Sequence, residues 1–510
     1  MKCDVAIVGA GPAGLNAAAS LAGWGLSVVV LDEYFRPGGR LLGQRYDVRQ
    51  HGHTKVWDGM AVAAELERKA RAAGAVIRCG TSVWDIEPGW KLQVAPGPEQ
   101  TIEADALIVA TGAIENALPV PGWTLPGVMT VGAAQTFTTV HKVAPGERVL
   151  VAGLDALALA VTGELANAGV KVVGVVLPPP NVFSGALANR RAVVGSLMSA
   201  AGLAPSRLLR WAGWFGRNRL VAAIAPLMAG MLPLRVWGVP LRFGKALVEV
   251  RGESAVESAV LRGVDSRGRA RGRPSEVAVD AVCICGGLSP LTDAARLVGC
   301  PTVELETLGG VVPIHNARME TPVDRLFLAG NITGIEGAPV AIAQGRVAAA
   351  SAARALGAGP PGGIEAELAA ALQEVVDARA ALPFHFISEI AAGREAMERV
   401  WAGAEAPVVP VPEPDTRAGA VADDLVVCRC EEVRYQDLAE QASDWASAVP
   451  GVKKRSRACM GTCQGRVCES AVRKLGRDRS RQLFPAQRAR SPLRPTRVGE
   501  LVPADSVERE

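Results

Sequence analysis

The sequence predicts an α/β protein with two nucleotide-binding βαβ units and a small cysteine-rich region near its end. Residues 3–32 and 148–177 each read as a buried strand, a glycine-containing turn, an alanine-rich helix and a second strand. Residues 428–468 hold five of the ten cysteines. At 510 residues the chain is long enough for about three domains, because one hydrophobic core stops growing well below that length. A single small binding module is therefore excluded.

Composition excludes a disordered chain and limits the partners. Hydrophobic residues make up 49% of the chain against 21% charged residues, and the mean hydropathy is +0.20. The net charge of +4 is too small to make the whole protein a polyanion binder. The basic segment 473–497 lacks interleaved aromatic residues and a reading helix, so no nucleic-acid partner is expected. The longest apolar run, 220–234, contains two prolines and is shorter than the roughly 20 residues of a membrane span, so no transmembrane segment is expected.

The chain begins directly with a strand and shows no signal-peptide pattern, which predicts a cytoplasmic location. Peripheral contact with the inner face of the membrane is left open. In a reducing compartment, ten cysteines are better explained by metal or redox chemistry than by a disulfide framework.

The first βαβ unit carries a glycine-rich turn that predicts a dinucleotide site. Gly9 permits a tight turn, Gly11 lets a pyrophosphate approach the backbone, and Gly14 allows close packing of helix on strand. Asp32 ends the next strand, where an acid holds the ribose hydroxyls of adenosine. The predicted cofactor-binding residues of this unit are Gly9, Gly11, Pro12, Ala13, Gly14, Asp32 and Glu33.

Three later segments resemble the FAD-binding segments of two-dinucleotide flavoproteins of the glutathione-reductase type. They contribute Gly38, Gly39, Arg40, Ala110, Thr111, Gly112, Gly330 and Asn331 to the predicted site. In that family the equivalent of Gly38 and Gly39 passes close to the cofactor, and an acid in the third segment holds the ribityl chain. Asn331 stands at the place of that acid, so a hydrogen bond can still form but its charge-assisted part is lost.

The second βαβ unit departs from a nucleotide-binding pattern. Asp155 replaces the glycine that would let the backbone meet a phosphate, and its carboxylate repels a pyrophosphate. The following strand ends at 175–178 without an acid for a ribose or an arginine for a 2′-phosphate. The sequence therefore predicts that NAD(P)H is not a substrate. Another nucleotide in this domain, or none, stays open.

The chain is not expected to carry out thiol–disulfide exchange, the reaction of disulfide reductases with this fold. The segment after Gly39 carries no redox cysteine pair, and Cys283 and Cys285 lie on one face of a buried strand. Both are predicted to be small core residues rather than a redox pair.

The C-terminal cysteines have the most specific spacing in the chain. Cys428, Cys430, Cys463 and Cys468 come from two tight loops and can supply the four soft sulfur ligands of a [2Fe–2S] cluster. A structural zinc is the rival, although a Cys-x-Cys pair is unusual for zinc, and uncoordinated thiols are the third reading. Cys459 is left over. Nearby basic residues would offset the charge of a thiolate cluster, namely Lys453, Lys454, Arg455, Arg457 and Arg466.

The predicted domains follow from these motifs and from composition. They are 1–125, the first part of the FAD domain; 126–310, an NAD(P)-like domain with a helical insertion at 178–240, strands resuming near 246 and a last strand at 277–285; 311–360, the second part of the FAD domain; 361–420, helices and a proline-rich linker; 421–476, the [2Fe–2S] domain; and 477–510, an extended basic tail.

Taken in order, these motifs resemble the iron–sulfur and FAD large subunit of heteromeric amine dehydrogenases. That group includes the large, cluster-bearing subunits of opine oxidase and hydrogen cyanide synthase, and the alpha chain of D-hydroxyproline and L-proline dehydrogenases. The resemblance covers residues 3 to about 501 and is weakest over 178–240. This chain departs from the family at Asp155, at Asn331 and at Cys459, where the family usually has glycine.

The resemblance implies an electron-transfer subunit rather than the site of substrate oxidation. It implies FAD in the first domain, a [2Fe–2S] cluster, FMN at the subunit contact, and a smaller FAD-containing partner with amino-acid-oxidase-like chemistry. Electrons would leave to a downstream acceptor. Two other hypotheses remain: a self-sufficient NAD(P)H-dependent flavin and iron–sulfur reductase, and a non-catalytic scaffold with a zinc site. No catalytic residue is assigned, because the five histidines are scattered.

Overall fold

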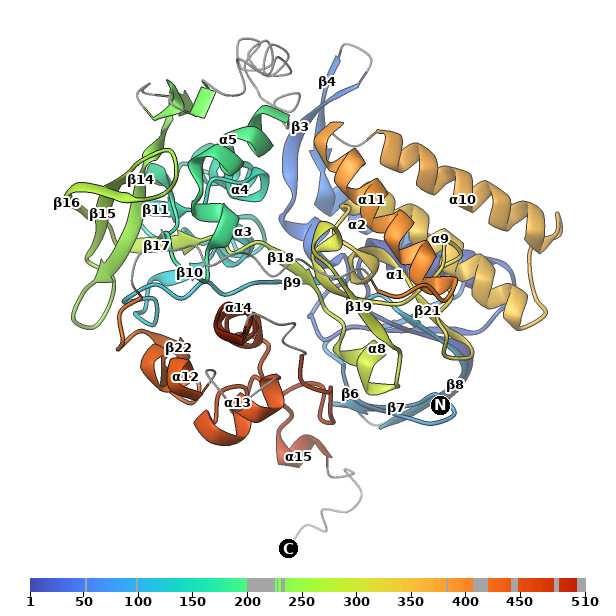
Figure 1. The fold of residues 1–510 in the computed structure, drawn as a ribbon. Helices are drawn as coiled ribbons and strands as arrows, with labels where there is room; N and C mark the ends of the chain where they lie inside the picture. The colour runs from blue at the N-terminus through green and yellow to red at the C-terminus, as the bar shows by residue number, and fades with distance from the viewer. Residues whose placement is uncertain are drawn as a thin grey trace, which may run out of the picture.

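The computed structural model of the chain describes residues 1–50, 53–97, 100–199, 225–226, 228–230, 234–381, 384–406, 421–441, 448–480 and 486–501. Two sheets, each with its own helices, stand side by side, and the C-terminal region lies beneath them in Figure 1. The first sheet is built from both early and late parts of the chain, so its domain is interrupted by the second.

The first sheet has the strand order β5-β2-β1-β8-β7-β6, with β21 added beside β8. Its strands are β1 (Lys2–Val8), β2 (Val28–Leu31), β5 (Val76–Arg78), β6 (Ser82–Glu87), β7 (Lys91–Ala95), β8 (Thr101–Val109) and β21 (Leu326–Leu328). β1 pairs in parallel with β2 and β8, as the predicted βαβ opening requires. β21 pairs in parallel with β8, with Leu326 opposite Leu107, so the chain returns to the first domain. Helices α1 (Pro12–Gly23) and α9 (Ala338–Ala355) pack together on this sheet through a largely alanine core.

The second sheet has the order β10-β17-β11-β12-β14-β15-β16, with β13 beside β14. Its strands are β10 (Val128–Thr130), β11 (Arg148–Ala152), β12 (Lys171–Leu177), β13 (Leu234–Val236), β14 (Val239–Arg251), β15 (Ser258–Val264), β16 (Ala270–Ala278) and β17 (Ala281–Ile284). Its helices include α3 (Val131–Thr139), α4 (Ala156–Asn167) and α5 (Arg190–Ser199). The parallel strands β11, β12 and β17 are buried almost throughout, which explains their continuous apolar sequence.

Two strand boundaries differ from those predicted. Strands resume at Leu234 rather than near 246, because Trp237 (φ 52°) and Gly238 (φ 77°) form a tight turn between β13 and β14. The strand predicted at 277–285 is divided between β16 and β17, because β16 pairs antiparallel with β15 while β17 pairs parallel with β11. Part of the predicted insertion at 178–240, namely 200–224, 227 and 231–233, lies outside the described residues, as does most of the predicted linker, 407–420.

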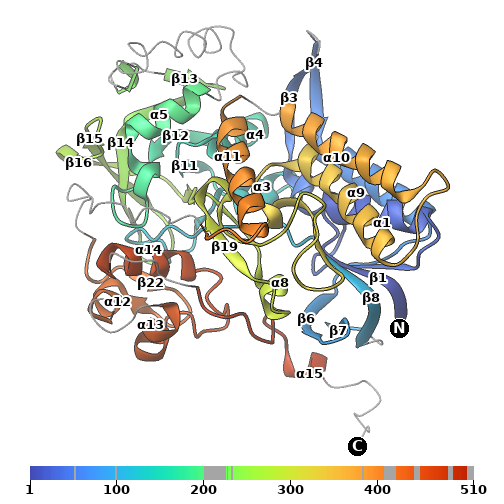
Figure 2. The same ribbon diagram turned by 45° about the vertical axis from the view of Figure 1, so that its right-hand side comes forward.

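The remaining elements connect or cover the two sheets. They are η1 (Gly39–Gly43), β3 (Arg45–Gln50), β4 (His53–Asp58), α2 (Gly59–Ala72), β9 (Ala113–Glu115), η2 (Gly185–Ala188), β18 (Leu288–Pro290), α8 (Asp293–Leu297), β19 (Thr302–Leu305), η4 (Glu306–Leu308), β20 (Gly310–Pro313), η5 (Gly330–Thr333), α10 (Ile364–Ala380) and α11 (Phe384–Trp401). Helix α10 packs on α9 at the outer side of the first domain, as Figure 2 shows from the side.

The cysteine region shares a hydrophobic core with the second sheet. It contains β22 (Val426–Cys428), β23 (Val433–Arg434), α12 (Tyr435–Gln441), α13 (Val449–Ser456), α14 (Glu469–Ser480) and α15 (Val498–Leu501). Val427, Leu438 and Val472 are buried in the same cluster as Val120 and Leu247. The predicted boundary after 476 falls inside α14, which continues to Ser480. Arg477, just past that boundary, pairs with Glu304 on β19 and so keeps the end of the helix attached.

Within the predicted extended basic tail, residues 486–494 contact other parts of the chain. The backbone N–H of Leu493 donates to the carbonyl oxygen of Trp84 at 2.7 Å, and the Leu493 side chain is buried against the first sheet. Arg494 forms an ion pair of 2.7 Å with Glu33. The segment thus runs from the cysteine loops to the first domain. We name residues 486–494 the strap.

No helix among the described residues is both long enough and apolar enough to cross a membrane.

A buried carboxyl links the two domains and gives a pH-dependent stability. Glu164 on α4 accepts hydrogen bonds from the Arg45 backbone N–H at 3.1 Å and from Gln135 Nε2 at 2.7 Å. Burial raises the pKa of Glu164 from 4.5 to about 7. Because the folded state holds this proton more tightly, folding stability from this group is full below pH 4.5 and is lost as the pH rises to about 7.

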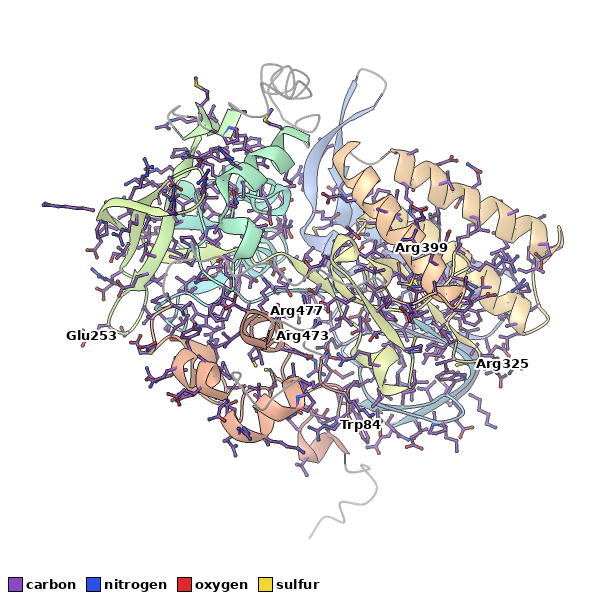
Figure 3. The ribbon with its side chains drawn as sticks, in the orientation of Figure 1. Trp84, Glu253, Arg325, Arg399, Arg473 and Arg477 are labelled. Atoms are coloured by element: carbon purple, nitrogen blue, oxygen red, sulfur yellow. The ribbon has the colours of Figure 1, made fainter. Side chains whose placement is uncertain are left out.

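We expect Glu164→Gln to remove that loss. At pH 8 the variant should be more stable than the wild type by about 2 kcal/mol, and the difference should vanish near pH 4.5. Gln135 can reverse its amide to keep both hydrogen bonds. Thermal unfolding between pH 5 and pH 8 measures the effect, with Glu253→Gln as the control because Glu253 lies at an exposed loop tip (Figure 3). Equal pH dependence in all three proteins would contradict the assignment.

Candidate cofactor and thiol sites

The glycine turn between β1 and α1 has the backbone contacts that its sequence predicts. A Cβ on Gly9 (φ 111°) would overlap the carbonyl oxygen of Ala110, and a Cβ on Gly14 would overlap the carbonyl oxygen of Gly9. Strand, turn and helix therefore meet at distances that only glycine permits. Pro12 and Ala13 form the first turn of α1, where their backbone conformation leaves the helix N-terminus open to an anion.

Gly11 differs from its two neighbours because the space beside it is open. A Cβ built there would meet nothing within 4 Å, and its backbone (φ −73°, ψ −177°) suits any residue. Packing within the chain therefore does not require glycine at this position. An open space at a helix N-terminus is where a pyrophosphate would sit. The residues present fit a dinucleotide on this ground.

Asp32 directly follows β2, and its carboxylate reaches the glycine turn. Its carboxylate accepts hydrogen bonds from the backbone N–H groups of Ala10 at 2.6 Å and Tyr34 at 2.8 Å. Burial raises the pKa of Asp32, and these two hydrogen bonds oppose the rise. Each carboxylate oxygen accepts one backbone bond and keeps a lone pair for a further donor such as a ribose hydroxyl.

The other predicted segments converge on the same turn. A Cβ on Gly39 would lie 3.1 Å from the Cα of Gly11, and a Cβ on Gly330 would lie 3.0 Å from the Cβ of Ala13. Gly38 donates its backbone N–H to the carbonyl oxygen of Ala10 at 2.8 Å. Segments far apart in the chain thus meet at the carboxyl ends of the parallel strands of the first sheet.

Other predicted site residues have partners within the chain. Glu33 pairs with Arg494 of the strap. Arg40 Nε donates to the Ala113 carbonyl oxygen at 3.3 Å, and Thr111 Oγ1 donates to the Leu291 carbonyl oxygen at 2.7 Å. Gly112 (φ 74°) turns the chain between β8 and β9. These contacts tie the edge of the site to its surroundings.

Asn331 lies in η5, and its side chain binds the backbone just before α9. Its Oδ1 accepts from the backbone N–H groups of Glu336 at 3.4 Å and Gly337 at 3.3 Å. Gln344, which the sequence analysis did not identify, is buried and accepts the Gly330 backbone N–H at 2.9 Å. A glutamine among alanines on a buried helix face is the sequence signal that could have drawn attention to it.

A second group missed from the sequence is a buried ion network beside Asn331. The Glu336 carboxylate binds Arg379 Nε at 2.5 Å and also pairs with Arg394. Arg394 Nη1 lies 2.6 Å from His315 Nε2. Burial, with the charge of Arg394, lowers the pKa of His315 to about 3, so this histidine is neutral. The network fixes α10 and α11 to the start of α9.

The second βαβ unit uses Asp155 for its own helix. Asp155 Oδ1 accepts the backbone N–H of Ala158 at 2.7 Å, which caps α4. Cys285 Sγ lies 3.2 Å from the same carboxylate. The acid therefore stands at the helix N-terminus where a pyrophosphate would bind, which supports the prediction that NAD(P)H is not a substrate.

Cys283 and Cys285 lie in the core of the second sheet. Burial raises the pKa of Cys283 to about 12, and burial together with Asp155 raises the pKa of Cys285 well above its ordinary value. Both thiols stay protonated at neutral pH and are poor nucleophiles. This supports their interpretation as core residues.

The structure brings the four predicted ligand cysteines together from two loops. The Sγ of Cys428 lies 3.9 Å from that of Cys430 and 3.6 Å from that of Cys468, and Cys430 lies 3.8 Å from Cys463. Two thiolates on one tetrahedral metal with bonds of about 2.3 Å are about 3.8 Å apart. A Cβ on Gly461 would overlap Cys430 Sγ, so glycine is needed there.

Hydrogen bonds set the protonation of this thiol cluster. The Cys468 thiol and the backbone N–H groups of Val467 and Gly465 lower the pKa of Cys463 to about 5. The Cys468 thiol also lowers the pKa of Cys428 to about 6, whereas burial raises the pKa of Cys430 to about 11. Cys428 and Cys463 are thiolates at neutral pH, the form that binds metal.

These contacts join pairs of sulfurs and do not amount to a single-ion site. Among the described residues, no group of three or more His, Cys, Asp or Glu side chains is arranged to hold one metal ion. A two-iron cluster requires only pairs of neighbouring sulfurs, because each iron takes two thiolates rather than three or four. The donor set, four soft sulfurs in mutual contact, fits such a cluster.

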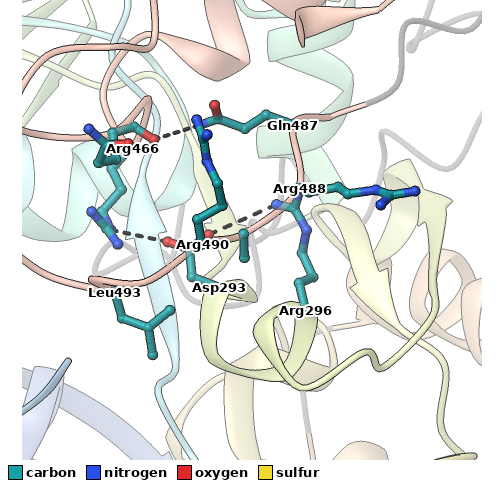
Figure 4. A pocket seen from close by; sticks show the side chains of 9 residues that line it. Asp293, Arg296, Arg466, Gln487, Arg488, Arg490 and Leu493 are labelled. Carbon is teal, nitrogen blue, oxygen red and sulfur yellow. Dashed lines mark hydrogen bonds and ion pairs between the residues drawn. The ribbon is translucent and has the colours of Figure 1, made fainter. Parts of the chain in front are cut away.

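The basic residues near the thiols are largely paired with other groups. Arg466 Nε lies 3.0 Å from Asp293 Oδ2, as Figure 4 shows, and Arg457 Nε lies 2.7 Å from Glu431 Oε2. Lys453 is buried and donates to Gln487 Oε1 of the strap at 3.1 Å. The cavity in Figure 4 also has Arg296, Arg488 and Arg490 in its lining, so positive charge exceeds negative charge beside the thiols.

The same region is attached to the β19–β20 hairpin through ion pairs. Arg473 and Arg477 on α14 both pair with Glu304 on β19, and the distance from Arg473 Nη2 to Glu304 Oε2 is 2.7 Å. Figure 3 shows both arginines on the side of α14 that faces the centre of the molecule. Trp123 Nε1 donates to the Val426 carbonyl oxygen at 2.6 Å, close to Cys428 in the chain. The thiol region is therefore anchored both to β19 and to the segment that precedes β10.

Comparison with known proteins defines the class first. Residues 3–204 match the pyridine nucleotide-disulphide oxidoreductase family, and residues 312–359 match the glucose inhibited division protein A family. The chain is therefore an oxidoreductase of the flavoprotein class. The solved structure of L-proline dehydrogenase from P. horikoshii has the same fold, with a TM-score of 0.66 at 20% identity over 98% of this chain and 80% of that one.

Curated relatives then narrow the class. A subunit of opine oxidase from Rhizobium meliloti is 28% identical over 98% of this chain and 87% of the relative. The HcnB subunit of hydrogen cyanide synthase from Pseudomonas aeruginosa is 29% identical over 92% of this chain and 91% of the relative. The chain is a homologue of these two subunits.

Proposed function

We propose that the chain is the FAD- and [2Fe–2S]-containing electron-transfer subunit of a heteromeric dehydrogenase. Its substrate would be a secondary amine or amino acid of the opine, proline, hydroxyproline or glycine type, oxidised on a CH–NH or CH–NH₂ bond by a smaller FAD-containing subunit. The proposal places the protein in the cytoplasm. The observation that carries it is the presence, in one chain, of an open dinucleotide turn and a four-thiol cluster.

In this proposal the first domain holds FAD. The α1 N-terminus and Gly11 would face the pyrophosphate, Asp32 would accept the ribose hydroxyls, and Asn331 would lie at the ribityl chain. FAD supplies the chemistry of accepting two electrons and releasing them singly. The chain's own residues bind and orient it, and the network of Glu336 and Arg394 keeps the start of α9 in place beside Asn331.

The thiol cluster completes the electron path in this proposal. Cys428, Cys430, Cys463 and Cys468 would hold the two irons, and a [2Fe–2S] cluster accepts one electron at a time. The excess of positive charge near the strap would favour the reduced, more negative state. The two curated relatives are both named as subunits, which supports a partner subunit for this chain. The proposal also includes FMN at the contact between the subunits.

Purification of the native complex tests the division of labour. The complex should oxidise an amine or amino acid from the four substrate types with an artificial electron acceptor, and the isolated chain should not. Recombining the chain with its smaller partner should restore the activity. Full amine dehydrogenase activity from the isolated chain would overturn the proposal.

The alternative of an NAD(P)H-dependent reductase makes a different prediction. Because Asp155 caps α4 and faces the phosphate position, we expect NADPH at physiological concentration to leave the flavin oxidised. Stopped-flow absorbance of the bound flavin measures this, with dithionite as the positive control. Flavin bleaching by NADPH within the time of turnover would favour the reductase instead.

A further inference from the structure

The fifth thiol of the cluster, Cys459, has no role among the four proposed ligands. Its side chain is completely buried. Its Sγ lies 3.5 Å from the Sγ of Cys468, closer than the 3.6 to 3.9 Å that separate the ligand pairs. Five sulfurs therefore stand where four are needed.

The backbone at Cys459 makes its presence notable. Its φ of 65° lies in the left-handed region, which favours glycine over any residue with a side chain. The chain thus carries a thiol at a position where its backbone alone would select glycine.

The surroundings hold the Cys459 thiol against the cluster. A Cβ on Gly465 would lie 3.2 Å from the Cβ and 3.5 Å from the Sγ of Cys459, so glycine at 465 leaves room for it. The Cys459 backbone N–H donates to the Cys428 sulfur. Cys459 therefore touches two of the ligand cysteines, one through its amide and one through its thiol.

We propose that Cys459 is a reserve ligand of the iron–sulfur cluster, able to take the place of Cys468. This inference rests on the proposed function, because it requires the cluster. In the exchange, the Cys459 sulfur would bind iron as the Cys468 sulfur leaves it, and the proton of the Cys459 thiol would pass to Cys468. The number of thiolates and the oxidation state of the iron do not change.

Iron content tests the exchange. The comparison uses the full chain with Cys468→Ala, Cys463→Ala, Cys459→Ala and the double variant Cys459→Ala/Cys468→Ala. We expect Cys468→Ala to keep at least about half of the wild-type iron and acid-labile sulfide, with altered visible circular dichroism and electron paramagnetic resonance spectra. Cys459→Ala should keep the wild-type spectra. The double variant and Cys463→Ala, which has no reserve thiol, should lose nearly all the iron.

Bound flavin and far-ultraviolet circular dichroism report folding in every variant. Loss of iron from Cys468→Ala to the level of Cys463→Ala, with flavin and fold retained, would overturn the reserve-ligand proposal. If the alanine variants accumulate poorly, Cys468→Ser and Cys463→Ser preserve the side-chain volume and are compared in the same way. A wild-type protein without iron would instead contradict the proposed function, so the two failures are distinguishable.

Discussion

Gly11→Val is expected to abolish FAD binding while the protein still folds. A valine side chain would enter the open space at the N-terminus of α1 and would meet no atom of the chain within 4 Å of its Cβ. It would instead occupy the position of the pyrophosphate and block the N–H groups that bind it. We expect the FAD affinity to fall by about 100-fold or more, a cost of about 3 kcal/mol. Fluorescence titration of flavin-free protein measures the loss.

Two other glycines of α1 separate this effect from a folding defect. A Cβ on Gly23, at the far end of the helix, also meets nothing within 4 Å, so Gly23→Val should bind FAD normally. Gly14→Ala should lower the thermal stability of the flavin-free protein, because its Cβ overlaps the carbonyl oxygen of Gly9. Normal FAD affinity in Gly11→Val would show that the cofactor does not sit at this turn.

Cys430→Ala is expected to remove iron and sulfide from the protein and to leave FAD in place. Cys430 is the exposed member of the thiol cluster, so its truncation leaves no cavity in the shared core. Its Sγ bridges the two loops, at 3.9 Å from Cys428 and 3.8 Å from Cys463. With one of four ligands gone, we expect iron to fall below about a tenth of the wild-type content.

Cys79→Ala provides the matched control, since Cys79 is a half-buried thiol of the first domain outside the cluster. It should keep both iron and flavin. In Cys430→Ala, electrons from the partner should still reach the flavins of the complex but should not pass to a one-electron acceptor. Unchanged iron content in Cys430→Ala would remove Cys430 from the ligand set.

The glycine turn and its acid were predictable because their roles are local. Gly9 and Gly14 are read from steric contacts within one βαβ unit, and Asp32 comes at the end of the next strand. Asp155 was equally readable, since one carboxylate at a helix N-terminus both caps the helix and repels a phosphate. The cysteines were also predictable as candidate ligands, because their spacing along the chain and the preference of soft metals for sulfur are both visible in the sequence.

Long-range contacts were not readable in this way. Nothing near Leu493 or Arg494 indicates that the strap reaches Trp84 and Glu33, which lie near the start of the chain. The shared core also escaped prediction, because Val427 and Leu247 follow ordinary strand patterns that do not name a partner. The start of the strands at Leu234 depends on the turn at Trp237, which has a positive φ. A tryptophan in the sequence does not indicate a positive φ, so this turn could not be predicted.

Metal and cofactor analysis of the wild-type protein tests the central proposal most directly. Inductively coupled plasma mass spectrometry, a sulfide assay and flavin extraction on the protein purified without oxygen should give about two irons, two sulfides and one FAD per chain. Dithionite reduction should then produce the paramagnetic resonance signal of a reduced [2Fe–2S] cluster. Zinc in place of iron, or a protein with neither iron nor flavin, would contradict the account.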